Sequence, residues 1–170
     1  MAGWRALRPA DLPALCRLAE AAHPSHPESP AVFAERLALA PGFCLALPGG
    51  EGLLGYAIAH PWAGPPPPLD SLLGALPEAP RALHLHDIAL AEAARGMGVG
   101  REALVRLLGM ARQAGLKEAS LVAIAGKQGY WQGQGFTPAA APGAALHGYG
   151  EGAVLMRRRL EQGVDRHEGA

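Results

Sequence analysis

The chain is poor in cysteine and carries no net charge. Its 170 residues include 2 cysteines, and 15 basic residues balance 15 acidic ones. Cys16 and Cys44 fall on predicted regular elements without the spacing of metal ligands, so we expect reduced, buried thiols of a cytoplasmic protein. Because no broad basic field is present, we expect no nucleic-acid partner.

Long apolar runs are also missing. A membrane helix needs roughly 20 consecutive apolar residues, and no stretch approaches that length, so no membrane partner is expected. The first residues contain no apolar signal-peptide core. A chain of this length favours one domain, which we expect over residues 1–160, followed by a polar tail over 161–170 that frays.

Apolar periodicity predicts helices and strands that alternate along the chain. Asp11 and Ser29 are placed to cap the first two helices. The predicted order is β-α-α-β-β-loop-β-α-β-α-β-β, which gives an α/β protein with a mixed sheet and helices on both faces. The strands are expected over residues 4–7, 43–47, 53–59, 83–90 and 119–125, in a hairpin from 136, and over 153–160.

Two loops have competing interpretations. Loop 23–28 holds two histidines, but no third ligand lies nearby, so we expect a surface loop and no metal site. Loop 61–76 is rich in proline, and the spacing of Leu72, Leu73 and Leu76 predicts one helical turn inside it. This second loop is either a spacer or a wall of a substrate site.

The most informative stretch runs from residue 82 to residue 115. An apolar strand is followed by the glycine turn RGMGVG at 95–100, and then by a helix with one apolar face. Glycines allow backbone N–H groups to approach an anion, and the helix N-terminus adds its positive end. We therefore expect this turn to bind the pyrophosphate of a coenzyme.

Two other phosphate-binding folds are excluded by the context of the turn. A dinucleotide fold expects G-x-G-x-x-G in its first strand-helix-strand unit and an acidic residue about 20 positions later. Here the turn lies in the middle of the chain, and Glu118 precedes a strand. A P-loop closes with G-K-[ST], whereas this turn continues Gly100-Arg101-Glu102.

Element order and motif together resemble the GNAT superfamily of acyl-CoA-dependent N-acetyltransferases. Arg95, Gly98 and Gly100 match the signature [QR]-x-x-G-x-[GA], and Gly135-Phe136 matches the Gly-Phe that follows the last helix. The resemblance covers residues 4–160. It implies a mixed, mostly antiparallel central sheet of about seven strands with helices on both faces.

The resemblance also implies an opening between the fourth and fifth strands that admits acetyl-CoA. Strand backbone would hold the pantetheine arm, and backbone N–H groups of the turn would hold the pyrophosphate, with arginine for residual charge. The coenzyme-binding residues implied are Ile88, Ala89, Leu90, Arg95, Gly96, Met97, Gly98, Val99, Gly100 and Arg101.

Two histidines precede the turn. His84 and His86 share one face of the predicted strand, roughly 7 Å apart, while Asp87 is expected on the other face. The segment 84–90 resembles the arylalkylamine N-acetyltransferase branch, whose histidines pass the proton of the substrate amine to water. A histidine side chain titrates near pH 6.5 and suits that task. The competing interpretation is a packed histidine pair on the sheet.

The usual general acid is absent from its position. Members of the superfamily carry a tyrosine four residues before the glycine of Gly-Phe, and that position is Trp131, which cannot release a proton as an acid. Tyr130 is adjacent but rotated about 100° around the helix. We predict Tyr130 as the candidate acid, with unassisted departure of the thiolate as the alternative.

The expected activity is transfer of an acetyl group from acetyl-CoA to a primary amine by direct attack in a ternary complex. The acceptor implied is a small arylalkylamine-like or polyamine-like molecule. Two alternatives remain open: a protein N-terminus or lysine as acceptor, and an acyl-CoA-binding module without catalysis. The sequence is compatible with a monomer or a homodimer.

Overall fold

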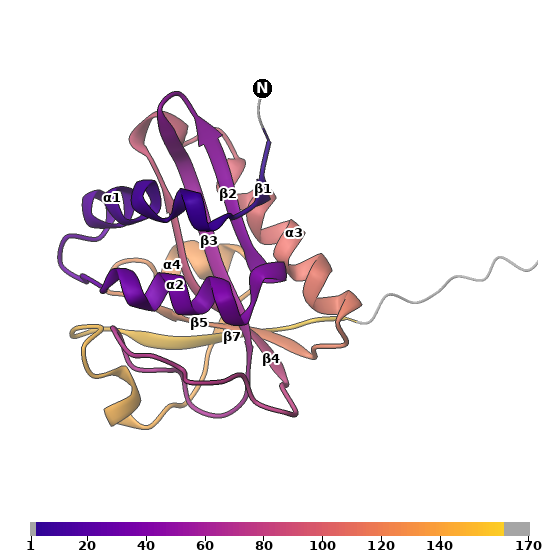
Figure 1. The fold of residues 1–170 in the computed structure, drawn as a ribbon. Coiled ribbons are helices and arrows are strands. Elements are labelled where there is room, and N and C mark those ends of the chain that lie inside the picture. The colour runs from indigo at the N-terminus through magenta and orange to yellow at the C-terminus, as the bar shows by residue number, and fades with distance from the viewer. Residues whose placement is uncertain (1–2, 162–170) are drawn as a thin grey trace, which may run out of the picture.

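The computed structural model describes residues 3–161, which form one mixed sheet with helices against both of its faces (Figure 1). The tail expected over 161–170 lies outside the described residues, apart from Glu161. The strands are β1 (Arg5–Ala6), β2 (Cys44–Gly49), β3 (Gly52–Trp62), β4 (Ala82–Leu90), β5 (Glu118–Ala123), β6 (Thr137–Pro138) and β7 (Val154–Arg159). The α-helices are α1 (Leu12–Ala22), α2 (Pro30–Leu39), α3 (Val99–Gln113) and α4 (Gln128–Gly133).

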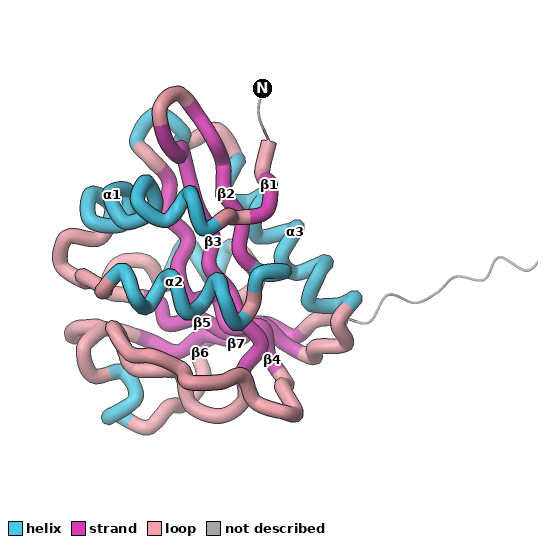
Figure 2. The backbone as a smooth tube through the Cα atoms, in the orientation of Figure 1, coloured by secondary structure: helices cyan, strands magenta, loops and turns pink. Residues whose placement is uncertain are grey.

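The sheet has seven strands in the order β1-β2-β3-β4-β5-β7-β6. β4 and β5 pair in parallel, and the other neighbouring strands pair antiparallel. The predicted order of elements and the mostly antiparallel sheet are therefore confirmed. The tube in Figure 2 shows α1 and α2 crossing one side of the strands, with long loops below them.

Each face of the sheet carries its own apolar core. The apolar face of α3 packs through Leu104, Leu107 and Leu108 on sheet residues that include Ala57 and Leu83. On the opposite face, α1 and α2 pack on Tyr56 and Ile58 of β3 among others. Successive residues of a strand point to opposite faces, which is why neighbouring residues of β3 belong to different cores.

β4 and β5 stay together for only a short distance. Their parallel pairing joins Ala82, Leu83 and His84 to residues 118–120, and no pair is formed further along β4. β5 continues to pair with β7 up to Ala123, and β4 continues to pair with β3 up to Leu90, so the sheet divides between β4 and β5. The two strands therefore diverge, and a cleft opens between their carboxyl halves.

A β-bulge interrupts β4 at His86. Ala59 of β3 faces Leu85, whereas the preceding residue Ile58 faces Asp87, so His86 is the extra residue on the bulged strand. A bulge breaks the strict alternation of side chains and re-aims those next to it. The pattern of apolar residues along β4 does not indicate this insertion.

Asp11 and Ser29 occupy the N-cap positions of α1 and α2 as predicted, but neither side chain is hydrogen-bonded to its helix. The carboxylate of Asp11 accepts hydrogen bonds from the Arg5 guanidinium, at 2.7 and 2.9 Å, and from the backbone N–H of Arg8 at 2.8 Å. The hydroxyl of Ser29 donates to Asp70 at 2.9 Å. These side chains are bonded to groups outside the helices, so the first N–H groups of α1 and α2 have no side-chain cap.

The helical turn predicted through Leu72, Leu73 and Leu76 does not form. The Glu35 carboxylate of α2 accepts the backbone N–H groups of Leu73 and Gly74, at 2.6 and 3.0 Å, so these donors are bonded outside the segment. Gly74 also has a φ of +78°, outside the helical region. Leu72 is 61% exposed, so this leucine does not pack into the core as one face of a helix would.

Within the described residues, no helix combines the length and apolarity that crossing a bilayer requires.

The buried face of α3 gives a stability prediction. Leu107 has no exposed surface, so Leu107→Ala should lower the free energy of unfolding by about 2–5 kcal/mol through lost burial and a residual cavity. Val105, on the same helix, is 60% exposed, and Val105→Ala should change stability by about 0.5 kcal/mol or less. Denaturant titration of both variants measures the difference, and equal losses would contradict the assignment of the two helix faces.

Candidate functional site

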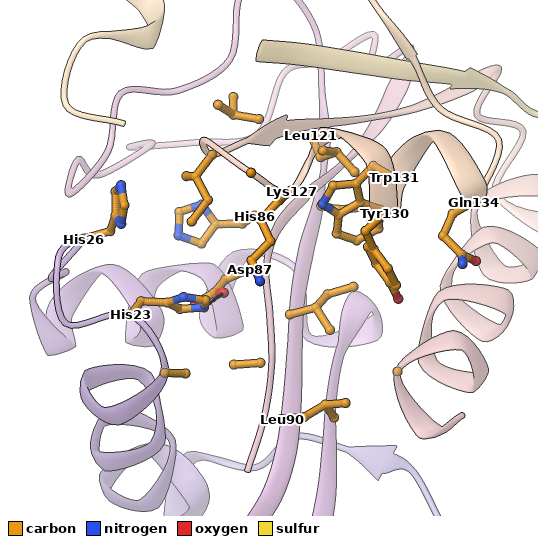
Figure 3. A pocket seen from close by; sticks show the side chains of 18 of the residues that line it. His23, His26, His86, Asp87, Leu90, Leu121, Lys127, Tyr130, Trp131 and Gln134 are labelled. Carbon is orange, nitrogen blue, oxygen red and sulfur yellow. Dashed lines mark hydrogen bonds and ion pairs between the residues drawn. The ribbon is translucent and has the colours of Figure 1, made fainter. Parts of the chain in front are cut away.

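The divergence of β4 and β5 creates a cavity of about 850 Å³. Figure 3 shows side chains entering it from two sides: His23, His26 and His86 lie on one side, and Tyr130, Trp131 and Gln134 lie on the other. We call the first side, which also includes Glu28, Leu69, Asp87 and Tyr149, the histidine lobe. The second side, which includes Arg95, Gly96, Gly98, Gly100 and Arg101, is the glycine-turn lobe.

The glycine turn is open and lies directly before α3. Gly96 and Gly98 both have a φ of +76°, a left-handed conformation that glycine adopts without steric cost. A Cβ atom added to either residue would meet nothing within 4 Å, so no side chain fills the space next to the turn. Gly98 occupies the N-cap position of a 15-residue helix, whose first N–H groups have no partner within the helix. The turn can therefore accept an anion from the cavity.

The predicted coenzyme residues lie around this cavity with two exceptions. Met97 is 59% exposed and lies outside the lining, and Val99 also lies outside it, with its carbonyl accepting the Trp4 indole N–H at 2.8 Å. The residues that line the cavity are Ile88, Ala89, Leu90, Arg95, Gly96, Gly98, Gly100 and Arg101.

The free edge of β4 supplies a second kind of contact. Residues 88–90 pair with β3 on one side but have no partner strand on the side that faces β5. A strand directs its N–H and C=O groups alternately to its two sides, so those facing the cleft are available to an extended ligand.

His86 forms a buried pair with Glu28. The Nε2–H of His86 donates to Oε1 of Glu28 at 2.7 Å, and the two side chains are only 1% and 5% exposed. The other carboxylate oxygen of Glu28 accepts the backbone N–H of Asp70 at 3.0 Å. Nδ1 of His86 is buried without a partner among the described residues. Glu28 belongs to the loop that the sequence indicated as plain surface, so it was missed.

Asp87 turns toward the same side of the sheet as His86, which corrects the expectation that it faces away. Because the bulge resets the alternation, its carboxylate accepts hydrogen bonds from the Tyr56 hydroxyl at 2.5 Å and from Nε2–H of His23 at 2.9 Å. The hydrogen bond to Asp87 raises the pKa of His23 above its ordinary value, against the opposing effect of burial. Asp87 therefore orients His23, while the hydrogen-bond partner of His86 is Glu28.

His84 lies behind His86 and does not line the cavity. Its Nδ1 is hydrogen-bonded to the hydroxyl of Ser120 at 3.0 Å, and it borders a separate cavity of about 180 Å³. The ring of His60 lies 5.4 Å from that of His84 and 6.5 Å from that of His86, between centroids. Burial lowers the pKa of His60 to about 3 and that of His84 well below its usual range, so both imidazoles are neutral at neutral pH.

Tyr130 and Trp131 line the other lobe side by side (Figure 3). The Trp131 ring packs against Phe136 in a T-shaped contact at 5.6 Å, which fixes the indole at the cavity wall. Tyr130 is 52% exposed, and its hydroxyl lies 4.0 Å from the position of a Cβ on Gly100, at the glycine turn. The phenol thus lies at the anion end of the cavity.

Tyr149 is a second phenol that sequence analysis missed. It lines the histidine lobe, is 7% exposed, and donates its hydroxyl proton to the carbonyl of Pro67 at 2.9 Å. Burial raises the pKa of this hydroxyl above its ordinary value. The sequence feature that could have indicated Tyr149 is its position as the one aromatic residue of its loop, between Gly148 and Gly150.

Among residues 3–161, no group of three or more histidine, cysteine, aspartate or glutamate side chains is arranged to hold a metal ion.

Comparison with known proteins identifies the fold. The profile of the Acetyltransferase (GNAT) family matches residues 11–136. No curated protein matches the sequence.

Solved structures match over almost the whole chain at low sequence identity. The GNAT-like decarboxylase GphF in complex with isobutyryl-CoA is 21% identical, with a TM-score of 0.77 over 93% of this chain and 99% of that one. The ribosomal-protein-S18-alanine N-acetyltransferase from Escherichia coli is 18% identical, with a TM-score of 0.64 over 98% of each chain. Naa20 from Chaetomium thermophilum, in complex with a bisubstrate analogue, is 19% identical, with a TM-score of 0.72 over 96% of this chain and 90% of that one.

The pair of His23 and Asp87 gives a prediction that is independent of function. Asp87→Asn removes the negative charge that favours the protonated imidazole, so the pKa of His23 should fall. The raised pKa stabilises the folded protein at pH values below the ordinary histidine pKa, and this contribution is lost as the pH rises through the folded pKa. His23→Gln should therefore cost more stability at pH 5.5 than at pH 8.5.

NMR titration of the His23 ring and thermal unfolding at the two pH values measure these effects. The exposed His147 serves as the control, and its titration should not respond to Asp87→Asn. A His23 titration curve that is the same in wild type and Asp87→Asn would contradict the hydrogen bond.

Proposed function

The chain belongs to the GNAT family of acetyltransferases, and from that premise we propose that it moves an acetyl group from acetyl-CoA to a primary amine of a small molecule. Family membership makes it an acyl-CoA-dependent N-acetyltransferase, an enzyme that uses an acyl-CoA and an acceptor. The observation that carries the proposal is the single cavity that joins an open anion-binding turn to the buried pair of His86 and Glu28.

The coenzyme would bind with its pyrophosphate at the N-terminus of α3. The open turn and the unpaired N–H groups of the first helical residues suit a diphosphate, and Arg95 and Arg101 add positive charge at the same wall. The pantetheine arm would extend along the free edge of β4 at residues 88–90. This orientation directs the thioester toward His86.

We infer that His86 and Glu28 accept the proton that the amine must lose. The amine nitrogen attacks the thioester carbonyl carbon, a tetrahedral intermediate forms, and the C–S bond then breaks. The buried pair offers an imidazole and a carboxylate joined by one hydrogen bond, at the end of the cavity away from the pyrophosphate. Backbone N–H groups on the free edge of β4 are available to stabilise the oxyanion.

His84 and Tyr130 do not contact the proposed proton acceptor through hydrogen bonds. His84 is neutral, buried and bonded to Ser120, which suits a residue that supports the wall behind His86. Tyr130, predicted from the sequence as the donor to the departing thiolate, has its hydroxyl at the glycine turn, where the pyrophosphate would bind, so we propose that water protonates the thiolate unless the Tyr130 side chain moves toward His86. Cytoplasmic location and a monomeric or homodimeric state remain predictions.

A second candidate function is decarboxylation of a carboxyacyl-CoA, as the description of GphF names that activity for a protein of this fold. The feature that favours it is Trp131 at the acid position, because decarboxylation keeps the thioester and releases no thiolate. The C–CO₂ bond breaks, the electron pair remains on the α-carbon, and a proton is added there. Loss of CO₂ without free thiol distinguishes this reaction from acetyl transfer.

The proposed coenzyme site predicts a loss of binding in Gly100→Glu. The new carboxylate would stand at the anion site, and Gly100, unlike Gly98, has no positive φ, so the backbone is not strained; an added Cβ would lie 3.3 Å from Cδ1 of Leu90, and Gly100→Ala controls for that contact. Acetyl-CoA should raise the melting temperature of wild type but not of this variant. The matched control is Gly109→Glu, in the same helix, where an added Cβ meets no atoms within 4 Å. Equal stabilisation of both variants would show that the turn does not hold the coenzyme.

The proposed proton acceptor predicts a loss of turnover in His86→Gln and Glu28→Gln. Each should lower kcat by about 10²–10⁴-fold and flatten the acid limb of the pH–rate profile, while coenzyme stabilisation persists. Release of free thiol from acetyl-CoA, with a panel of arylalkylamines and polyamines, measures turnover.

His147→Gln changes an exposed histidine and is the control for that experiment. His84→Gln should have a smaller effect than His86→Gln. If both His86→Gln and Glu28→Gln keep the wild-type pH–rate profile, the pair is not the proton acceptor.

A further inference from the structure

Three segments far apart in the sequence meet at the outer end of the histidine lobe. They are the α1–α2 loop (residues 23–29), the proline-rich strap between β3 and β4 (residues 63–81), and the loop that precedes β7 (residues 143–153). Each contributes to the lining of the cavity: His26 and Glu28 from the first, Leu69 from the strap, and Tyr149 from the third. The ribbon of Figure 1 and the tube of Figure 2 both place the strap beside the loop before β7, below α2.

Hydrogen bonds join the three segments directly. Nε2–H of His26 donates to the carbonyl of Tyr149 at 3.0 Å, and the Tyr149 hydroxyl donates to the carbonyl of Pro67 at 2.9 Å. The loop before β7 also approaches its neighbours closely. A Cβ on Gly148 would lie 3.6 Å from Cβ of Leu69, and a Cβ on Gly150 would lie 3.9 Å from Nε2 of His26. Tyr149 thus bridges the α1–α2 loop and the strap.

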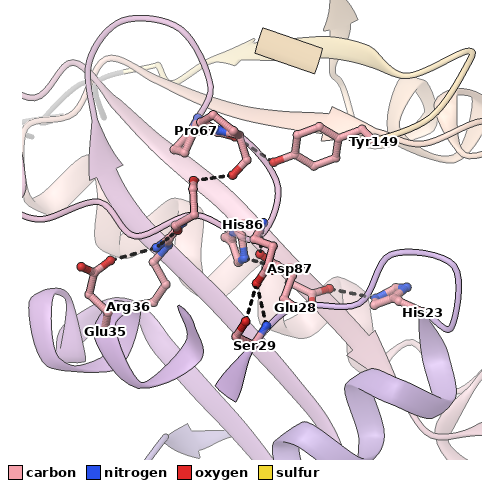
Figure 4. A network of polar contacts seen from close by, with 12 residues as sticks. His23, Glu28, Ser29, Glu35, Arg36, Pro67, His86, Asp87 and Tyr149 are labelled. Carbon is pink, nitrogen blue, oxygen red and sulfur yellow. Dashed lines mark hydrogen bonds and ion pairs between the residues drawn. The ribbon is translucent and has the colours of Figure 1, made fainter. Parts of the chain in front are cut away.

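The strap is also hydrogen-bonded to Arg36 of α2 and to Glu28, one member of the proposed proton acceptor. Asp70 accepts the backbone N–H of Ser29 at 2.7 Å, and its own backbone N–H donates to Glu28 at 3.0 Å. The buried guanidinium of Arg36 donates to the carbonyl of Ser71 at 3.0 Å. Figure 4 shows these contacts together with the neighbouring pairs of Glu35 with Arg36 and of His23 with Asp87. Asp70 has a φ of +56°, a conformation that costs energy and that this network holds.

We propose that these three segments act as a closed end wall, so that the acceptor is a compact amine enclosed in the histidine lobe and not the N-terminus or a lysine of a polypeptide. This inference rests on the proposed acetyl transfer. Because the bridges at Tyr149 close the outer end of the lobe, a polypeptide acceptor could reach His86 only through the part of the cavity that the acyl-pantetheine arm would also occupy.

The size and lining of the lobe support a small acceptor. The whole cavity measures about 850 Å³, within the roughly 300–1,000 Å³ range of small-ligand pockets, and the acyl-pantetheine arm must share that volume. Leu69 and the Tyr149 ring add apolar surface, while Glu28 and Asp87 add carboxylates that favour a cationic group. The acceptor chemistry that fits is a primary amine on a short apolar or aromatic body.

The test compares a small free amine with a peptide as the acetyl acceptor. The small amine is phenethylamine, and the peptide has ten residues, a free N-terminus and one lysine. Each is incubated with wild-type protein and acetyl-CoA, and the release of free thiol is measured. Wild type should favour the free amine by about 100-fold or more in kcat/KM, because the peptide cannot be enclosed. If the peptide matches or exceeds the amine, the closed wall is overturned and acetyl transfer stands. If no acceptor releases thiol, the proposed function itself fails.

Tyr149→Phe sharpens the test because it removes only the hydroxyl that holds Pro67. The variant keeps the ring in the lobe, and it should raise the ratio of kcat/KM for a bulkier arylalkylamine over phenethylamine by about tenfold. His147→Gln, in the same loop but exposed, should leave that ratio unchanged. An unchanged ratio in Tyr149→Phe would show that the bridge does not limit acceptor size, and the wild-type comparison decides the proposal if the variant does not fold.

Discussion

The structure depends on one failure of strand pairing. β4 and β5 run in parallel for three residue pairs and then part, while β5 remains paired with β7. Unpaired backbone groups in a protein interior are costly, so a sheet that opens in this way needs another partner for them. The free edge of β4, the open glycine turn and the first turn of α3 all face the resulting space, and together they form a surface suited to an extended anionic ligand.

A second local irregularity determines which side chains meet that ligand. The bulge at His86 places His86 and Asp87 on the same side of the sheet, each against a group from the α1–α2 loop. A regular strand would have sent Asp87 into the core of α3, where its charge would have been buried without a partner. The bulge therefore allows two histidine–carboxylate pairs to line one lobe, and the proposed proton transfer rests on one of them, His86 with Glu28.

Sequence analysis predicted the parts of the site that are local in the chain. The glycine turn and the helix after it could be recognised because their residues are consecutive and their backbone conformation follows from glycine. The order of elements followed from apolar periodicity in the same way. The features that sequence analysis missed depend on contacts between residues that are far apart in the chain, or on a local irregularity. Glu28 reaches His86 across 58 positions, Tyr149 reaches Pro67 across 82, and a one-residue bulge in β4 leaves no mark in the pattern of apolar residues.

The position of Trp131 makes its fluorescence sensitive to occupancy of the cleft. Its indole lines the cavity at the glycine-turn lobe, opposite the histidines (Figure 3). The other two tryptophans lie elsewhere: Trp4 donates to the carbonyl of Val99, and Trp62 donates to that of Pro65. A molecule that fills the cleft replaces water next to one indole and leaves the other two as they were. The change in emission that follows reports occupancy of the site without a label.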